Sequence, residues 1–376
     1  MIFWVDEFGS YSIQNEANTK DLMEDSIYSQ VGSDTADATS DDILLVDDPD
    51  PLADASSVAL AFSTPFGSVS PTYYPKVNVP FSVGEIPFVG TQFKIFVDGI
   101  SGTDGKGWHC TLRNVANIAI CGFYIRPTGA LAFYNDTGTV QFNSPTPLLT
   151  NDSWHLVEFT ATRTGTSLNT LPGAVTLVMK INNVEIFNGS IDMDTVVDDF
   201  AMLTWKIVRH TAGGGGKTYI KDFILYDNTG SYNTTFLGPV YIMRRTVNTD
   251  SDFQWTPSTG STGYTLLNEA GPVDTTYIGA SSTLPLPSYF GLEDLPADAV
   301  SVRAVMLYGR MRKEDAGSGT VRMSLKNGAT ATNGNDREIT TAFKYWSDVL
   351  EVNANTATAW TPTEFNAATF KIDRTS

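Results

Sequence analysis

Hydrophobic and polar residues alternate with the two-residue period of β-strands along most of the chain. In a strand, successive side chains point to opposite faces, so a half-buried strand alternates apolar and polar positions. The clearest strand-like segments, rich in β-branched and aromatic residues, are Phe93–Val97, Ile118–Ile125, Ala130–Tyr134, Trp154–Thr160, Val175–Ile181 and Val184–Phe187. We predict a β-strand at each of them.

Turn-forming residues separate these segments. They are Pro127-Thr128-Gly129, Asn135-Asp136, Asn182-Asn183 and Asp227-Asn228. Strands that follow one another every 8–12 residues or so, joined by such turns, are typical of a β-sandwich. The one helical candidate is the segment 18–28, with Asn18 or Thr19 as its cap. The pattern therefore predicts an all-β protein with little helix.

A second domain is predicted to begin after the break Phe236–Pro239. Residues 247–298 are rich in turn signals, and we expect Tyr264–Ala280 to form an ordered arm or loop within them. Further strand-like segments follow at Val300–Tyr308, Thr320–Leu325, Glu338–Tyr345 and Thr369–Ile372. We therefore divide the chain into residues 1–238 and a smaller β-sandwich domain, with its turn-rich arm, at 239–376.

The charge of the chain limits its partners. Its 376 residues include 24 Lys and Arg against 42 Asp and Glu, a formal net charge of −18. A nucleic-acid binder needs a basic surface to neutralise phosphates, and an anionic membrane surface attracts basic segments. The first ten residues lack the basic and long apolar regions of a signal peptide. We expect no nucleic-acid partner, no membrane insertion and no secretion signal.

Acidic residues are concentrated in an excursion at about 21–75, which contains 11 acids and no Lys or Arg. Its aspartates could form a cation site, dock a basic partner or simply form a solvated surface; they cluster at Asp34, Asp37, Asp41, Asp42, Asp47, Asp48, Asp50 and Asp54. The region lacks the Asp-x-Asp-x-Asp-Gly loop with a closing Glu that cages calcium, which favours the solvated surface. A second, weak cation hypothesis concerns Asp192, Asp194, Asp198 and Asp199, which also lack the turn glycine.

Two further sequence features have structural interpretations. Cys110 and Cys121 flank a segment whose turn at Val115-Ala116 would place them opposite each other on a hairpin, and we predict two buried, reduced thiols. The four-glycine run 213–216 is followed by a strand-like segment, whereas a phosphate-binding loop leads into a helix. We therefore interpret it as a flexible hairpin tip.

Several segments resemble a known family. Trp154–Phe187, with a Trp-His strand start and a hairpin around Ile181-Asn182-Asn183, resembles the laminin-G-like, concanavalin A-like jelly roll, and Tyr219–Asn228 resembles its last strand. The order of later motifs is similar to structural proteins of tailed-bacteriophage virions, as is the start Val5–Tyr11; these motifs include Phe236–Pro239, Asp252–Ser258, Asn268-Glu269, Asp274–Ile278, Ala359–Thr361 and Glu364–Asn366. The resemblance implies a jelly roll in front of a second β domain and a place in a virion.

The residues themselves offer no recognisable catalytic pattern. Retaining glycan hydrolases of this architecture place two carboxylates ~5 Å apart on one strand face. Here Glu158 and Glu185 are isolated, and Asp192 and Asp194 lie in turn-like sequence. The histidines are His109, His155 and His210; none has metal-ligand spacing, no Gly-x-Ser-x-Gly elbow is present, and His155 is interpreted as structural. We assign no catalytic, cofactor-binding or metal-ligating residue and expect no cofactor.

Three functions are left open at this point. The first is a non-catalytic virion structural protein, exposed on the tail or capsid as a fibre, spike or decoration. It would act as a homo-oligomer with other virion proteins as partners and could bind a host-surface glycan through many weak sites. The second is a stand-alone glycan-binding lectin, and the third is a glycan-degrading tail enzyme. The first is our expectation from the sequence, and it makes the protein no enzyme.

Overall fold

The structure is a computed structural model, and it describes residues 1–6, 30–33, 43–47, 49, 58–63, 75–81, 83–98, 107–126, 128–164, 173–194, 199–207, 217–260, 262–268, 274–280, 286–314 and 316–376. The chain divides into two compact units. The first comprises Met1 and Phe3–Ile242, and the second comprises Ile2 and Met243–Ser376.

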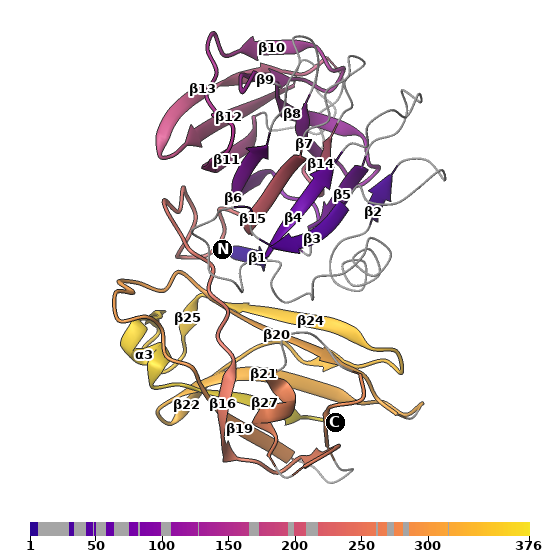
Figure 1. Cartoon of the computed structure of the whole chain (residues 1–376), viewed down its shortest axis with the longest axis vertical. Helices are drawn as coiled ribbons and strands as arrows, with labels where there is room; N and C mark the ends of the chain where they lie inside the picture. The colour runs from indigo at the N-terminus through magenta and orange to yellow at the C-terminus, as the bar shows by residue number, and fades with distance from the viewer. Residues whose placement is uncertain are drawn as a thin grey trace. The chain divides into compact units, whose positions relative to one another are not determined.

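The first unit is a sandwich of two antiparallel sheets, as Figure 1 shows. The eight-stranded sheet has the order β13-β12-β11-β6-β15-β4-β3, with β1 also paired to β15. Its strands are β1 (Ile2–Asp6), β3 (Ile43–Asp47), β4 (Val58–Ser63), β6 (Phe88–Asp98), β11 (Trp154–Thr164), β12 (Ala174–Ile181), β13 (Val184–Asp192) and β15 (Lys217–Tyr226).

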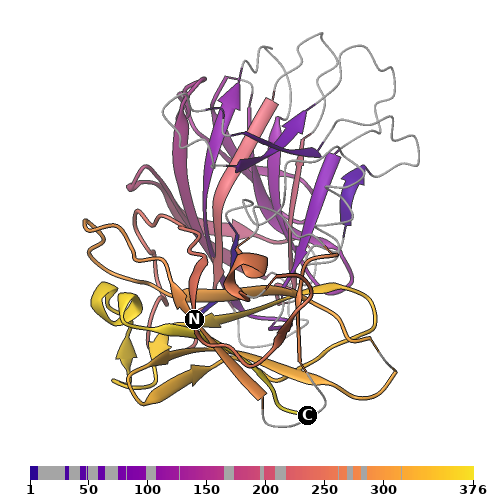
Figure 2. The same ribbon diagram turned by 60° about the horizontal axis from the view of Figure 1, so that its bottom comes forward.

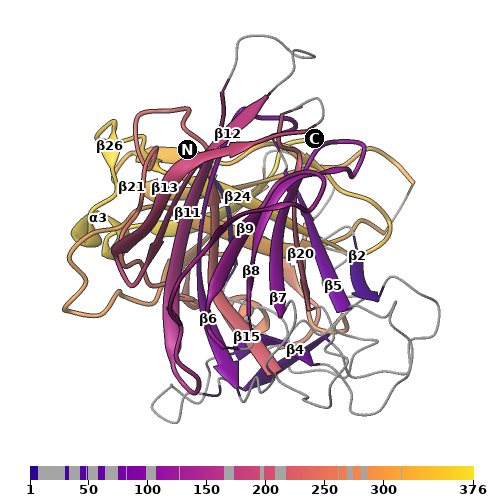
Figure 3. The same cartoon turned by 90° about the horizontal axis from the view of Figure 1, so that it is seen from above.

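The seven-stranded sheet forms the other layer, which is seen beside the first from above in Figure 3. Its order is β10-β9-β8-β7-β14-β5-β2. Its strands are β2 (Gln30–Ser33), β5 (Pro75–Pro80), β7 (Trp108–Arg113), β8 (Ala119–Ile125), β9 (Leu131–Tyr134), β10 (Val140–Asn143) and β14 (Met202–Ile207). This arrangement confirms the predicted concanavalin A-like jelly roll.

Aromatic side chains from both sheets fill the space between the layers. Phe93 on β6 packs against Trp108 on β7 and Trp205 on β14, with ring centroids 5.4 and 6.1 Å apart. Phe123 on β8 meets Phe159 on β11 at 5.4 Å. All five side chains are almost completely buried. Since each such ring removes a large apolar area from water, this row fixes which face of each strand points inward.

The second unit is also all-β, and its strands are the orange and yellow ones of Figure 2. A six-stranded sheet contains β16 (Val247–Asp252), β19 (Leu286–Leu292), β21 (Thr320–Asn327), β22 (Thr330–Asn333), β23 (Arg337–Glu338) and β27 (Thr369–Arg374). Three two-strand pairs accompany it: β20 (Val305–Met311) with β24 (Lys344–Leu350), β17 (Thr256–Pro257) with β18 (Ile278–Gly279), and β25 (Val352–Asn353) with β26 (Thr358–Ala359). The short helices are α2 (Tyr264–Leu267) and α3 (Pro362–Asn366).

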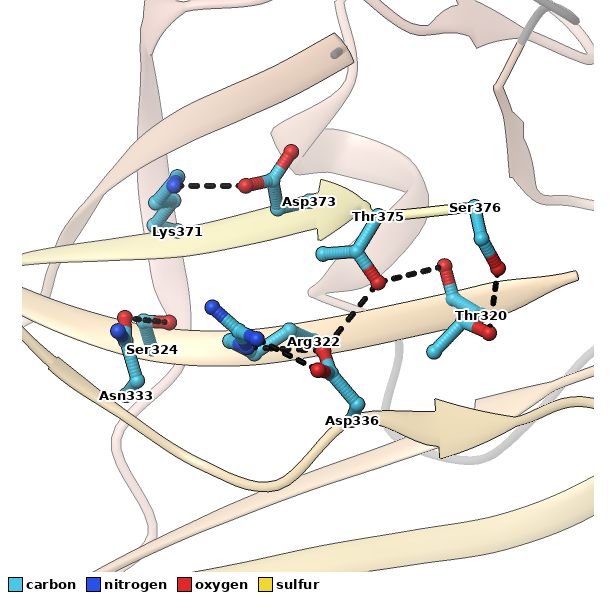
Figure 4. A network of polar contacts seen from close by, with 9 residues as sticks. All are labelled: Thr320, Arg322, Ser324, Asn333, Asp336, Lys371, Asp373, Thr375 and Ser376. Atoms are coloured by element: carbon cyan, nitrogen blue, oxygen red, sulfur yellow. Dashed lines mark hydrogen bonds and ion pairs between the residues drawn. The ribbon is translucent and has the colours of Figure 1, made fainter. Parts of the chain in front are cut away.

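The core of this unit lies between the six-stranded sheet and the β20–β24 pair. Met323 and Leu325 from β21 pack in one cluster with Leu307 from β20 and Leu350 from β24, together with Trp360. The predicted second β-sandwich is thereby confirmed. The opposite, outer face of the six-stranded sheet is held by polar contacts (Figure 4), which include Arg322–Asp336, Lys371–Asp373 and Ser376–Thr320.

Some sequence expectations differ from the structure. The segment predicted as a strand at Val300–Tyr308 becomes one only from Val305, where pairing with β24 begins. The segment Glu338–Tyr345 is split, because its first residue pairs with β21 and its last two pair with β20. The helical candidate 18–28 and the glycine run 213–216 lie outside the described residues. In the part of the chain that is described, no helix is long and apolar enough to span a membrane.

Candidate functional site

The outer face of the seven-stranded sheet carries an unusual concentration of chemically active side chains. Trp108, Cys110 and Leu112 of β7 point into the sandwich, so His109, Thr111 and Arg113 point the other way. The same alternation places Tyr124 of β8 and Tyr134 of β9 on the outer face. We call this the β7–β9 face; it is defined by the outward side chains Asn78, His109, Thr111, Arg113, Tyr124, Arg126, Tyr134, Thr204 and Lys206.

Tyr134 lies across the neighbouring strand. Gly122 of β8 is its partner in the register, and a Cβ atom on that glycine would overlap the tyrosine ring. The missing side chain lets the tyrosine reach β7, where its hydroxyl and the Thr111 hydroxyl share a hydrogen bond of 2.6 Å. The phenol is thus held at one position over the centre of the sheet.

His109 is enclosed by the two tyrosines. Its ring stacks on Tyr124 with centroids 5.2 Å apart, and it lies 5.9 Å from the ring of Tyr134. The histidine is only 5% exposed, and both tyrosines are buried as well. An imidazole and a phenol are therefore fixed side by side, which is the arrangement needed for a pair of proton-transferring groups.

Cationic side chains surround this group. Lys206 of β14 is directly opposite His109 in the strand register. Arg113 lies on β7 and donates to the carbonyl oxygen of Asn117 at 2.8 Å. Arg126, beyond the end of β8, donates to Asn143 Oδ1 at 2.7 Å, and its guanidinium lies 5.7 Å from the ring centroid of Tyr124.

Acidic side chains are missing from the described positions of the β7–β9 face, although the chain as a whole carries a net charge of −18. Its other polar groups are neutral: Thr204 donates to Asn78 Oδ1 at 2.8 Å, and both residues are buried. The charged side chains among the described positions of this face are therefore all cationic, in a chain that is acidic as a whole.

Burial determines the protonation state of Tyr134. It raises the pKa of the phenol far above its ordinary value of 10, while the hydrogen bond with Thr111 and the nearby charge of Arg113 act in the opposite direction. The hydroxyl is consequently neutral at physiological pH and has a proton to give. A neutral phenol beside a histidine can act as a general acid.

The residues singled out in the sequence lie elsewhere. Asp194 accepts hydrogen bonds from Asn135 and Thr137, and Asp199 pairs with Arg163, so these carboxylates support local structure. No group of three potential metal ligands occurs among the described residues. Asp198 and the acidic cluster of residues 34–54 lie outside the described side chains.

His155 and the cysteines have structural surroundings. The ring of His155 bonds to Thr150 and Asn182, in the structural setting assigned to it. Cys110 and Cys121 are free and buried, and burial raises the pKa of the Cys121 thiol to about 12. They are not directly opposite each other as the assumed hairpin turn implied, because Cys121 pairs with Leu112.

Comparisons with known proteins give a fold but no family. No known protein family and no curated protein matches the sequence. Among solved structures, the chain is similar to a PL-14 alginate lyase from Aplysia kurodai, with 11% identity and a TM-score of 0.44 over 60% of this chain and 99% of the lyase. It is also similar to a GH131 β-glucanase catalytic domain from Podospora anserina, with 12% identity and a TM-score of 0.38 over 62% of this chain and 98% of that domain.

A third similar structure is an alginate lyase from a Chlorella virus, at 9% identity and a TM-score of 0.33, covering 45% of this chain and 84% of the lyase. These structures are carbohydrate-active enzymes. The expectation of a non-catalytic virion structural protein is therefore wrong, and its tail, capsid and bacteriophage parts have no support from the comparisons. At these identities and TM-scores the likeness concerns the fold alone, so any reaction has to be argued from the side chains of this chain.

Proposed function

We propose that the N-terminal jelly roll processes a glycan and that the β7–β9 face is its reaction site. One observation carries the proposal: a histidine lies beside two buried tyrosines, with cationic side chains around it and no acid on the described part of the face. Groups that transfer protons and groups that bind an anion are thus brought together on one sheet.

The residue types select the reaction class. Hydrolysis by the common route needs two carboxylates on either side of the bond, and the described face offers none. Removal of a proton next to a carboxyl group needs a base, an acid and positive charge to stabilise the electrons that collect on the carboxyl oxygens. His109 and Tyr134 supply the first two, and Arg113, Arg126 or Lys206 supplies the charge. We therefore propose β-elimination on a glycan that carries carboxyl groups.

In this reaction His109 takes the proton from the carbon next to the carboxyl group. The electron pair of that C–H bond forms a carbon–carbon double bond, and the glycosidic C–O bond on the neighbouring carbon breaks. Tyr134 gives its proton to the departing oxygen, which leaves as a hydroxyl group. Proton exchange with water then restores the neutral histidine and the neutral phenol. The cleavage requires no added water and leaves an unsaturated sugar at one new chain end.

Access to these groups requires movement, because His109 and Tyr134 are buried. A glycan would reach them only after the surroundings of the face open. Opening and closing of this kind is common at active sites and excludes water from the reaction. The proposal predicts a site that is closed when empty.

The products test the proposal. The full chain is incubated with a carboxylated polysaccharide and, separately, with a neutral β-glucan. The masses of the products are measured by mass spectrometry. Elimination predicts fragments from the carboxylated polymer with an unsaturated end, lighter by one water than hydrolysis products, and their loss in His109→Ala. A matched control is Tyr289→Phe in the second unit, which should leave the products unchanged. Hydrolysis products, or no cleavage of any carboxylated polymer in a broad set, would contradict the proposal.

A host-surface glycan as ligand is in keeping with this proposal, and assembly into a homo-oligomer would let several weak sites act together. Both stay predictions, and sedimentation velocity of the full chain measures the second.

A further inference from the structure

A hollow of about 270 Å³ lies on the opposite side of the jelly roll, on the outer face of the eight-stranded sheet. Trp154 of β11 and Tyr241 form its aromatic sides, Lys94 and Leu156 lie on the sheet, and Asn182 and Asn183 come from the turn between β12 and β13. Its volume is close to the lower end of ligand pockets, roughly 300 Å³. The hollow has room for one small polar ligand.

A segment that crosses the sheet builds one side of the hollow. We call residues 236–241 the crossing segment. The backbone N–H groups of Leu237 and Gly238 both donate to Glu158 Oε1 at 3.0 Å, and Glu158 is only 1% exposed. At the end of the segment, the Lys94 ammonium lies 4.3 Å from the ring centroid of Tyr241. Tyr241 thus contacts the outer face of the eight-stranded sheet through Lys94.

The turn on the other side is fixed as well. Asn182 and Asn183 both have positive φ, of 49° and 66°, as a two-residue hairpin turn requires. Leu156 N–H donates to Asn182 Oδ1 at 2.9 Å, and Asn182 N–H donates to the Leu156 carbonyl at 2.8 Å. These two hydrogen bonds tie the turn to β11. The exposed side-chain amide of Asn183 makes none of these contacts and is available to a ligand.

The charged side chain in the lining of the hollow has a partner of opposite charge. The Lys94 ammonium pairs with Asp222 Oδ2 at 2.6 Å. The Lys221 ammonium lies 4.5 Å from the ring centroid of Trp154. Among the described residues that line the hollow, Lys94 is the one charged side chain, and Asp222 compensates it, so the lining does not select an anion, whereas aromatic rings and amides remain. Rings that are apolar on their faces, next to fixed hydrogen-bonding groups, suit a ligand with an apolar face and hydroxyls around its edge.

We infer that this hollow is a second glycan site, which binds one neutral sugar ring without cleaving it. The ring would lie against Trp154 or Tyr241, with its hydroxyls bonded to the amide of Asn183 and the ammonium of Lys94. The inference does not rest on the elimination reaction, because the residues involved lie on the other sheet. A non-catalytic site of this kind would keep a long glycan near the protein between cleavages.

The experiment is a titration of the full chain with a panel of neutral sugars: glucose, galactose, mannose, N-acetylglucosamine and short β-glucan oligomers. Binding is followed by ligand-detected NMR, and the same titrations are made with Tyr241→Ala, Asn183→Ala and His109→Ala. We expect saturable binding of at least one neutral sugar, weakened at least about tenfold by the first two substitutions and unchanged by the third.

Two controls make the outcome decisive. Tyr241 is 68% exposed, so its substitution leaves the fold intact, and thermal unfolding checks this. Cleavage of short substrates by Tyr241→Ala should equal that of the wild type, which separates failure of this site from failure of the reaction site. The inference is overturned if no neutral sugar binds saturably, if binding is unaffected in both hollow variants, or if His109→Ala abolishes it.

Discussion

The two outer faces of the jelly roll are built alike and charged differently. On each, a tyrosine ring lies over a glycine of the neighbouring strand: Tyr134 over Gly122 on the seven-stranded sheet, and Tyr226 over Gly90 on the eight-stranded sheet. Near Tyr134 lie a histidine and cations. Near Tyr226 lies the buried carboxylate of Glu158, which holds backbone N–H groups.

Under the proposed function, this difference separates reaction from attachment within one architecture. Both tyrosines have a pKa raised mainly by burial, so burial by itself does not distinguish a reacting phenol from a structural one. The neighbouring side chains distinguish them, because the proposed elimination needs a base beside the acidic phenol and cations that hold the carboxylate of the substrate. We assign chemistry to the face with His109 and attachment to the face with Glu158.

The largest effect is expected from removing the hydroxyl group of Tyr134, and the corresponding removal on the other face serves as its control. Tyr134→Phe should lower the rate of glycan cleavage by about 10²–10⁴-fold, the usual contribution of a general acid. Tyr226→Phe is the matched control and should leave the rate within about twofold of the wild type. Initial rates with the same carboxylated polymer measure both. Equal losses in the two variants would mean that the faces do not differ in chemistry.

The two glycines give a second comparison. Gly122→Ala and Gly90→Ala should each lower the free energy of unfolding by about 1–3 kcal/mol, since the new methyl group overlaps a packed ring. At Gly90 the three atoms nearest to the added methyl group all belong to the tyrosine ring, so adding Tyr226→Ala should relieve that part of the cost. At Gly122 the methyl group also overlaps the Cys110 carbonyl oxygen. Adding Tyr134→Ala should therefore leave much of the cost of Gly122→Ala in place. Denaturant unfolding of the four variants measures this, and equal rescue at both sites would refute the difference.

These contacts also show what the sequence could and could not predict. The alternation in Phe93–Val97 and Trp154–Thr160 predicts strands correctly, because period two is a local property of the backbone. In the run Ile118–Ile125, however, both faces carry apolar or aromatic residues, so the pattern does not say which face is the core. Tyr124, which belongs to this run, lies outside the Trp108–Phe123 core, on the other face of the sheet.

The sequence also does not predict the local charge of a face or the hydrogen-bond partners that come from distant parts of the chain. A net charge is a sum over the chain, and it does not reveal that Arg113 and Lys206 come together on one face. Glu158 is isolated among its sequence neighbours, and its partners Leu237 and Gly238 come from the other end of the first unit. Only the strand order, which places β11 under the crossing segment, reveals its role.

A smaller effect should be seen in the pH dependence of Glu158. Burial raises the pKa of this carboxyl above its ordinary value of 4.5, against the opposing effect of the two backbone N–H groups. The unfolded chain therefore loses this proton at lower pH than the folded chain. As the pH rises through 4.5 and on through the raised folded value, the wild type should lose stability relative to Glu158→Gln.

Urea unfolding between acidic and neutral pH measures that difference. Glu185→Gln, which removes an exposed carboxylate from β13, is the matched control and should show no such trend relative to the wild type. A wild type that gains stability relative to Glu158→Gln over the same pH range would contradict the assignment of a buried, desolvated carboxyl.

The smallest effect is expected at the rim of the hollow. Tyr241→Ala should change the free energy of unfolding by no more than about 0.5 kcal/mol, as is usual for an exposed side chain. Thermal unfolding monitored by circular dichroism measures it. A loss well above this value would mean that Tyr241 serves the fold, so that the aromatic side of the hollow is a structural feature.

The central claim is that the glycan reacts on the β7–β9 face. A crystal structure of Tyr134→Phe with a carboxylated oligosaccharide tests it most directly, because this variant keeps the ring and should cleave the ligand far more slowly. The account predicts the sugar over β7, β8 and β9, with the carbon next to its carboxyl group close to His109 and the carboxylate bonded to Arg113, Arg126 or Lys206. An oligosaccharide bound only on the eight-stranded sheet, with the β7–β9 face empty, would contradict it.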